Sequence, residues 1–244
     1  MRRFPRHGGW VSPGQIPVQI KDEATMQIPH AVLRPLVLGL ILLWSAVAVA
    51  KSPEAMIKES FNASLDALME HHEAIAEDPT VGEELIDEIL GPRVHFELMS
   101  RLILGRYWNQ ADAQQQERFV SAFRRNVIRT YSRMLADNID DAIEMVAGED
   151  EILRVDRVTG PDDRGRATVR TTLRFSEASV PVHYRLIRAE DDDAEWLAYD
   201  VVIENISFVT NYRQEYSSAI RRDGVETLIS RLEERNERAR QRDG

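Results

Sequence analysis

The spacing of hydrophobic residues changes along this chain, and that change limits the folds available to it. In one long segment, apolar residues recur every three or four positions: Phe119, Phe123, Val127, Tyr131 and Met134. This spacing predicts a helix that starts near residue 111, with Asp112 as its N-cap. After residue 140, apolar and polar residues alternate one by one, as they do in a half-buried strand. Helices followed by a sheet predict an α+β fold rather than an alternating βαβ fold.

Shorter helices are predicted before the long one. Apolar residues have helical spacing over residues 57–69, 85–90 and 94–104. The second of these segments stops at Gly91-Pro92, a pair that ends helices.

About four antiparallel strands are predicted in the second half of the chain, over residues 143–158, 169–175, 180–186 and 196–203. A final helical segment carries Tyr212 and continues beyond Gly224 to Leu232. Residues 233–244 are almost entirely charged or polar, so we expect a flexible tail there.

The N-terminal region resembles an export signal. Residues 35–50 carry no charge, and they end in Ala48-Val49-Ala50, the small-x-small pattern that signal peptidase cleaves. A membrane-spanning helix needs about 20 apolar residues, so this run is short for a span. We therefore expect residues 1–50 to be a leader that is cleaved near Ala50, with Met26 as a candidate start, and the mature protein to be periplasmic. An uncleaved membrane anchor is the alternative.

Composition excludes several classes of protein. The chain has no cysteine, which rules out a disulfide scaffold and a cysteine nucleophile. Its 31 basic and 41 acidic residues give a net charge of −10, which argues against a nucleic-acid partner. The leader holds five basic and two acidic residues, so the mature chain carries a net charge of −13.

Candidate catalytic residues are few. No HExxH, GxSxG, P-loop or GxGxxG motif occurs, and no metal site is predicted. His71 and His72 are adjacent and cannot face one ligand from a helix, and His95 and His183 are isolated in the sequence. We predict that the protein is not an enzyme, although Asp200 or His183 in a pocket would support an enzyme. A structural role is the commoner one for a carboxylate among strand residues, and Ser207 is predicted to be a cap or turn residue.

Four arginines of the long helix form a second candidate site. A phosphate-binding row is one interpretation, and a solvated face with acidic neighbours is the other and the preferred one. The residues are Arg124, Arg125, Arg129 and Arg133.

Two segments resemble blocks of the MlaC family, the periplasmic phospholipid-binding components of the Mla lipid-transport system, also called the toluene-tolerance auxiliary family. Residues 101–108 followed by residues 114–119 resemble its LGxxW…QxxxF block, and residues 199–213 resemble its DVxxxGxSxxxNYR block. The chain has Asn205 where the family usually has glycine, and asparagine tolerates positive φ better than other non-glycine residues. The resemblance covers residues 53–232, within an expected domain of residues 51–232.

This resemblance implies a fold and a function. The fold is a curved antiparallel sheet of about four strands, packed with helices around an apolar cavity. The cargo is a phospholipid, with its acyl chains in the cavity, and no cofactor is needed. The implied partners are an inner-membrane ABC transporter complex with an MCE-domain protein and an outer-membrane lipoprotein–porin complex. A monomer that maintains the lipid asymmetry of the outer membrane is expected.

Apolar residues of the predicted helices and strands are candidates for the cavity wall. They are Phe96, Met99, Phe119, Phe123, Val127, Tyr131, Val169, Leu173, Phe175, Val182, Tyr184, Leu186, Ile203 and Phe208. The same residues are equally consistent with a solid core, because periodicity does not distinguish the two. An enzyme or a protein-binding adaptor on a similar scaffold are the alternative functions.

Overall fold

The computed structural model describes residues 51–147, 151–175, 178–189 and 195–243. The predicted leader, residues 1–50, lies outside this part of the chain. Within it, no helix is both long enough and apolar enough to span a membrane.

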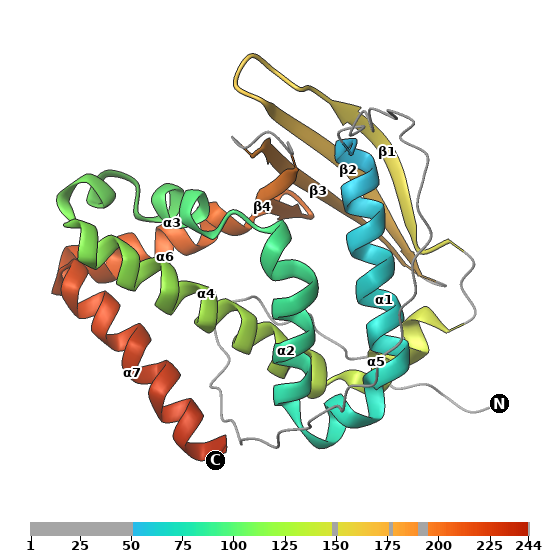
Figure 1. Cartoon of the computed structure of the whole chain (residues 1–244), viewed down its shortest axis with the longest axis horizontal. Helices are drawn as coiled ribbons and strands as arrows, with labels where there is room; N and C mark the ends of the chain where they lie inside the picture. Colours follow the sequence, from blue (N-terminus) through green and yellow to red (C-terminus); the bar gives the residue numbers. More distant parts are fainter. Residues whose placement is uncertain (1–50, 148–150, 176–177, 190–194, 244) are drawn as a thin grey trace, which may run out of the picture.

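The fold is α+β, as the change of period predicts (Figure 1). Its helices are α1 (Pro53–Glu77), α2 (Pro79–Leu90), α3 (Phe96–Leu104), α4 (Ala113–Ala136), α5 (Ile139–Val146), α6 (Phe208–Asp223) and α7 (Val225–Asp243). Short 3-10 helices follow α2 and α3, at Gly91–Arg93 and Gly105–Gln110. The strands are β1 (Leu153–Thr159), β2 (Arg166–Phe175), β3 (Ala178–Arg188), β4 (Trp196–Ile203) and β5 (Ile206–Ser207). They form one antiparallel sheet in the order β1-β2-β3-β4-β5.

Side-chain caps set the starts of the long helices. Asp78 separates α1 from α2, and its carboxylate accepts a hydrogen bond from the Thr80 amide at 2.9 Å. Asp112 forms a capping box with Gln115 at the start of α4, as its position in the sequence predicts. Each cap satisfies amide groups that have no partner inside the helix.

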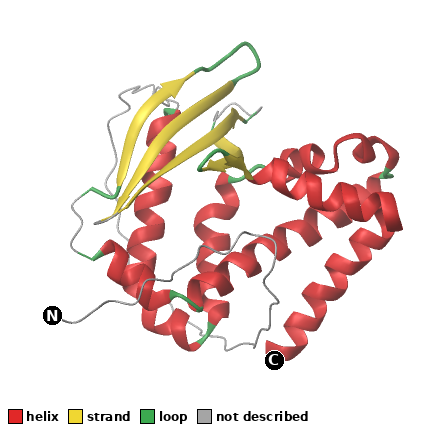
Figure 2. Cartoon of the chain, turned by 180° about the vertical axis from the view of Figure 1, so that it is seen from behind, coloured by secondary structure: helices red, strands yellow, loops and turns green. Residues whose placement is uncertain are grey.

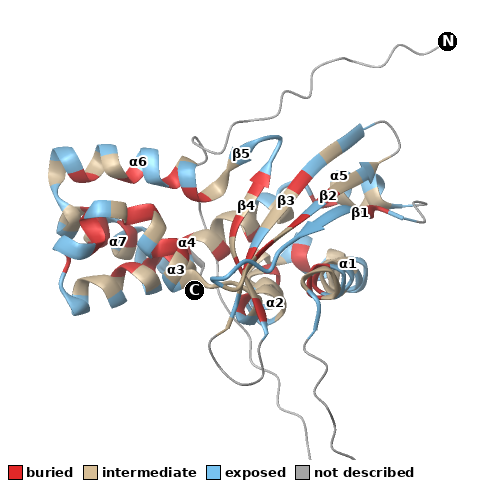
Figure 3. Cartoon of the chain, turned by 90° about the horizontal axis from the view of Figure 1, so that it is seen from above, coloured by how far each residue is buried: buried red, intermediate tan, exposed pale blue. Residues whose placement is uncertain are grey.

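The molecule has a sheet part and a helical part (Figures 1 and 2). Helix α1 packs on one face of the sheet, where Met56 and Ile57 contact a buried cluster that includes Val169 and Leu186. Helices α3, α4, α6 and α7 enclose a separate aromatic core around Phe119 (Figure 3). In this core the rings of Phe119 and Phe123 stack with centroids 5.8 Å apart.

The fifth strand depends on a tight turn. Glu204 and Asn205 join β4 to β5 with φ values of 49° and 69°. Two consecutive residues with positive φ are typical of the hairpin turns that match the twist of a sheet. Asparagine therefore occupies the place of the family's glycine without breaking the turn.

Two predictions about secondary structure are wrong. The first strand does not cover residues 143–158, because residues 139–146 form α5 and β1 begins only at Leu153. The second difference concerns residues 233–243, which are expected to be a flexible tail, whereas α7 continues to Asp243. Asn236 and Ala239 form a narrow buried seam, and the Asn236 side-chain amide donates a hydrogen bond to the Ala122 carbonyl of α4 at 3.0 Å.

Candidate functional site: an apolar cavity

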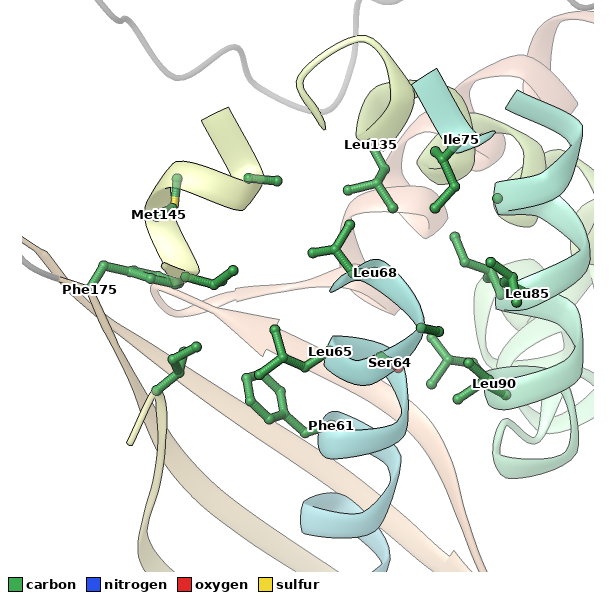
Figure 4. A pocket seen from close by; sticks show the side chains of 17 residues that line it. Phe61, Ser64, Leu65, Leu68, Ile75, Leu85, Leu90, Leu135, Met145 and Phe175 are labelled. Carbon is green, nitrogen blue, oxygen red and sulfur yellow. The ribbon is translucent and has the colours of Figure 1, made fainter. Parts of the chain in front are cut away.

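A cavity of about 380 Å³ lies between α1 and α2, and it extends to α5, the end of α4 and the ends of β1 and β2 (Figure 4). This volume is in the range of sites that hold small molecules. In the view of Figure 4, Met145 and Phe175 lie on one side of α1, and Leu85 and Leu90 lie on the other. The lining residues are Phe61, Ser64, Leu65, Ala67, Leu68, Ile75, Gly82, Leu85, Ile86, Ile89, Leu90, Leu135, Ala142, Met145, Val146, Ile152 and Phe175.

Helical spacing explains how α1 and α2 present this wall. Phe61, Leu65 and Leu68 follow one another at intervals of four and three on α1. Such residues share one face of a helix. Helix α2 adds Leu85 and Ile89 at an interval of four.

Most side chains of this wall are half-buried, which distinguishes them from a solid core. Leu65, Leu68 and Leu85 keep part of their surface accessible although they lie inside the fold. Phe119 and Phe123, in the helical core, have no accessible surface at all. A closely packed interior leaves few voids larger than a water molecule, so this half-exposure marks space without protein atoms.

The wall is almost entirely hydrocarbon. Ser64 is its one polar side chain among the described residues, and its hydroxyl donates a hydrogen bond to the Ser60 carbonyl of the same helix at 2.8 Å. No polar group of the wall therefore needs a partner from a ligand. A cavity of this chemistry suits an alkyl chain and offers nothing to a polar molecule.

Of the fourteen predicted wall residues, only Phe175 lines this cavity. Two of the others, Phe119 and Phe123, are fully buried in the aromatic core with Met99, and Phe96, Val127 and Phe208 pack against that core. The other thirteen residues do not line this cavity, and their contact with lipid stays a prediction.

Six of the remaining predicted residues lie on strands of the sheet, and Tyr131 lies on α4. Val169 and Leu186 belong to the cluster under α1, with Leu173 and Tyr184 packed beside it. Val182 is buried, whereas Ile203 is 49% exposed. The rings of Tyr131 and Phe208 are in contact, with their centroids 6.0 Å apart.

The sequence predicts the helical spacing of α1 and α2, but it does not identify their apolar faces as cavity walls. The available signal is the width of the apolar face of α2. This face is broader than a single packing partner would cover, and it consists of Leu85, Ile86, Ile89 and Leu90. A short helix with so wide an apolar face must cover two neighbours or border a space.

Asp200 and Ser207 have structural positions. The Asp200 side chain is buried, and its carboxylate accepts hydrogen bonds from the Val209 amide at 3.0 Å and the Ser207 hydroxyl at 2.7 Å. A guanidinium nitrogen of Arg185 lies 2.9 Å from the same carboxylate. Ser207 is the N-cap of α6, because its hydroxyl oxygen accepts from the Thr210 amide at 3.1 Å. Neither Asp200 nor His183 lines the cavity.

Three of the four arginines in the α4 row, Arg124, Arg129 and Arg133, are partnered by carboxylates. Arg124 lies 2.6 Å from Asp87, and Arg129 lies 3.1 Å from Glu83, both on α2. These ion pairs match the preferred interpretation, a helix face with acidic neighbours. Within the described residues, no three histidine, aspartate or glutamate side chains come together as metal ligands.

Burial keeps the tyrosines of the interior uncharged. Desolvation raises the pKa of Tyr184 to about 12, and it raises the pKa values of Tyr131, Tyr212 and Tyr216 above the ordinary value. A tyrosine hydroxyl is already protonated at neutral pH, and these shifts keep the buried hydroxyls uncharged at more alkaline pH as well.

Comparisons with known proteins agree with the resemblance seen in the sequence. The family model "MlaC protein" matches residues 58–234. A binding protein of an intermembrane phospholipid transport system, MlaC of Haemophilus influenzae, is 20% identical over 81% of this chain and 88% of its own length. A toluene tolerance protein of Pseudomonas putida is 24% identical over 76% of this chain and 83% of its own length.

A solved structure shares the fold. It is a phospholipid-binding protein from Ralstonia solanacearum in complex with a phospholipid, and it superimposes with a TM-score of 0.64 at 23% identity. The match covers 78% of this chain and 99% of that one. The family model covers most of the described residues, and the chain belongs to the MlaC family.

Proposed function

We propose that the protein is a periplasmic carrier that holds a phospholipid with its acyl chains in the cavity between α1 and α2. The observation that carries this proposal is the apolar, half-buried wall of that cavity, which has one self-satisfied hydroxyl and no charge. A phospholipid presents alkyl chains to such a wall and keeps its head group in water. The names of the relatives support lipid as the cargo, since two of them bind or transport phospholipid.

The energetics of lipid transfer explain why a carrier needs no catalytic group. Each methylene removed from water contributes about 0.8 kcal/mol, so two acyl chains of roughly 30 methylenes contribute about 24 kcal/mol. Moving both chains from a bilayer into water would therefore cost more than the tightest non-covalent affinities, about 18 to 21 kcal/mol. A lipid consequently does not cross an aqueous gap alone at a useful rate. An apolar cavity replaces the bilayer as surroundings for the chains, and the net cost of transfer becomes small.

The proposed route lies between the inner and outer membranes. The protein would exchange lipid with an inner-membrane ABC transporter complex carrying an MCE-domain protein and with an outer-membrane lipoprotein–porin complex, and so maintain outer-membrane asymmetry. Residues 1–50 would act as the export signal, cleaved near Ala50, and residues 51–232 would form the carrier domain. The match to a transport system in Haemophilus influenzae supports this placement.

Bound lipid in detergent-free protein tests the proposal. Native mass spectrometry of the mature chain should show the mass of a phospholipid, and solvent extraction should recover it. Leu68→Trp fills the cavity and should remove this lipid while the protein stays folded. Met69→Trp is the matched control, because Met69 is the next residue of α1 and is 45% exposed outside the cavity. Lipid-free wild-type protein, or equal lipid in both variants, would contradict the proposal.

A further inference from the structure

The sheet face opposite α1 carries a group of exposed basic side chains, which we call the arginine face. It consists of Arg154, Arg157, Arg170, Arg174, Arg185 and His183, on β1, β2 and β3. All five arginines are exposed, and His183 is half-buried. The alternate residues of the same strands, such as Val169 and Leu186, point to the other face and pack under α1.

Strand register places like charges directly opposite one another. Arg157 of β1 pairs with Arg170 of β2. Directly opposite like charges destabilise an antiparallel sheet. This row therefore works against folding, and a role in binding explains why it would be kept.

Several of these side chains have no partner. Arg154 bonds to Asp156, and Arg185 bonds to the buried Asp200. The side chains of Arg157, Arg170 and Arg174 make no hydrogen bond or ion pair with any residue that the structure describes. Their guanidinium groups are available to an external acceptor.

The charge of this region is opposite to that of the whole chain. Residues 153–188 contain eight arginines against three aspartates and one glutamate, whereas the full chain has a net charge of −10. Five of these eight arginines belong to the arginine face, whereas Arg188 lies over the Trp196 ring, so the face is a basic surface on an acidic protein. Such an arrangement orients a molecule as it approaches a negative partner.

We propose that the arginine face is a docking surface for an acidic protein surface on a membrane-bound complex with which the protein exchanges lipid. This inference rests on the proposed carrier function and adds a surface to it. Arginine suits the role because its planar guanidinium binds carboxylates through two parallel hydrogen bonds. Arg174 also neighbours Phe175, which lines the cavity, so the docked partner would lie against the strand that forms part of the cavity wall.

An acidic pair in the β1–β2 turn borders the arginine face, which favours a protein over a bilayer. Asp162 and Asp163 of this turn are exposed, beside Arg164. The turn adjoins Arg166, at the end of β2 that pairs with Ile187 of β3. An extended anionic membrane would meet these carboxylates as well, whereas a compact acidic patch on a protein would not.

Charge reversal tests this surface. The variant Arg157→Glu/Arg170→Glu keeps a like-charge pair, so its stability should match that of the wild type. The control Arg101→Glu/Arg221→Glu makes the same change of net charge at exposed positions of α3 and α6. The probes are the purified periplasmic part of the MCE-domain protein, the purified outer-membrane lipoprotein complex, and phosphatidylethanolamine vesicles with phosphatidylglycerol. Binding is measured by surface plasmon resonance at low and at high salt.

The expected result is that the Arg157/Arg170 variant binds at least one protein probe about tenfold more weakly than the control variant does. Added salt should weaken wild-type binding and reduce this difference. Equal binding by both variants, absence of wild-type binding to either protein probe, or a loss confined to the vesicles would overturn the proposal. Bound phospholipid is measured on the same samples. If the docking proposal fails but the protein still holds lipid, the proposed carrier function is unaffected.

Discussion

The carboxylate of Asp200 on β4 accepts a hydrogen bond from the backbone amide of Val209 in the first turn of α6, at 3.0 Å. This contact joins the sheet to the helical part of the molecule. It also explains why the most polar residue of β4 is 1% exposed: the carboxylate is held by donors from β3, from the N-cap of α6 and from the α6 backbone.

Asp200→Ala should therefore lower stability without affecting lipid. The substitution leaves the buried Val209 amide without its acceptor, and we expect a loss of about 2 kcal/mol in the free energy of unfolding. Lipid per folded molecule should not change, because Asp200 does not line the cavity. Urea denaturation and lipid extraction on one preparation check this. Loss of lipid at unchanged stability would instead support a catalytic or binding role for Asp200.

Truncation should distinguish the cavity wall from the solid core. Phe119→Ala should cost about 3–5 kcal/mol, because Phe119 is completely enclosed by neighbours. Leu85→Ala should cost only about 1 kcal/mol in lipid-free protein, since Leu85 already borders empty space. Chemical denaturation of delipidated variants measures both values. Similar losses at the two sites would show that the α2 wall is packed as tightly as the core.

The end of α7 should contribute to stability. Ala239→Leu inserts a larger side chain at a fully buried position of the helix and should cost about 1–3 kcal/mol. Arg240→Leu, at the next and exposed position, serves as the control and should have little effect. Thermal unfolding followed by circular dichroism compares the two. A flexible tail, by contrast, would make the two variants indistinguishable.

One ion pair between α4 and α7 should depend on pH. The guanidinium of Arg118 makes two hydrogen bonds to the Glu233 carboxylate, at 2.9 and 2.7 Å, and it holds the pKa of Glu233 below the ordinary value of 4.5. A lowered pKa in the folded state means that stability is present above the unfolded-state pKa and is lost as pH falls through the folded-state pKa.

Glu233→Gln should therefore melt at a lower temperature than the wild type near neutral pH, and this difference should disappear at pH values well below 4.5. The effect should be small, because the pair is partly exposed and solvent screens it. Melting curves across this range give the answer. A difference that stays constant in acid would mean that Glu233 contributes through packing and not through its charge.

Family, fold class and most element positions could be predicted from sequence. The stripe from Phe119 to Tyr131 became α4, and the block that contains Asp200 and Ser207 became β4 and the N-cap of α6. Local sequence patterns are sufficient to predict these elements, because hydrophobic spacing, helix caps and turn residues each act over a few positions. They failed at residues 139–146 and 233–243, where helices packed against their neighbours. For α7, the buried seam of small residues was too narrow to appear as a hydrophobic stripe.

The sequence by itself determined which faces of the helices and strands avoid water, and tertiary packing decided what those faces meet. Phe119 and Leu68 both lie on apolar stripes of helical spacing, yet Phe119 is enclosed by aromatic rings and Leu68 borders the cavity. Periodicity does not separate these outcomes, because a neighbouring side chain and an acyl chain both keep water from an apolar surface. Only the distance at which α1, α2 and α5 are held apart leaves the space between them.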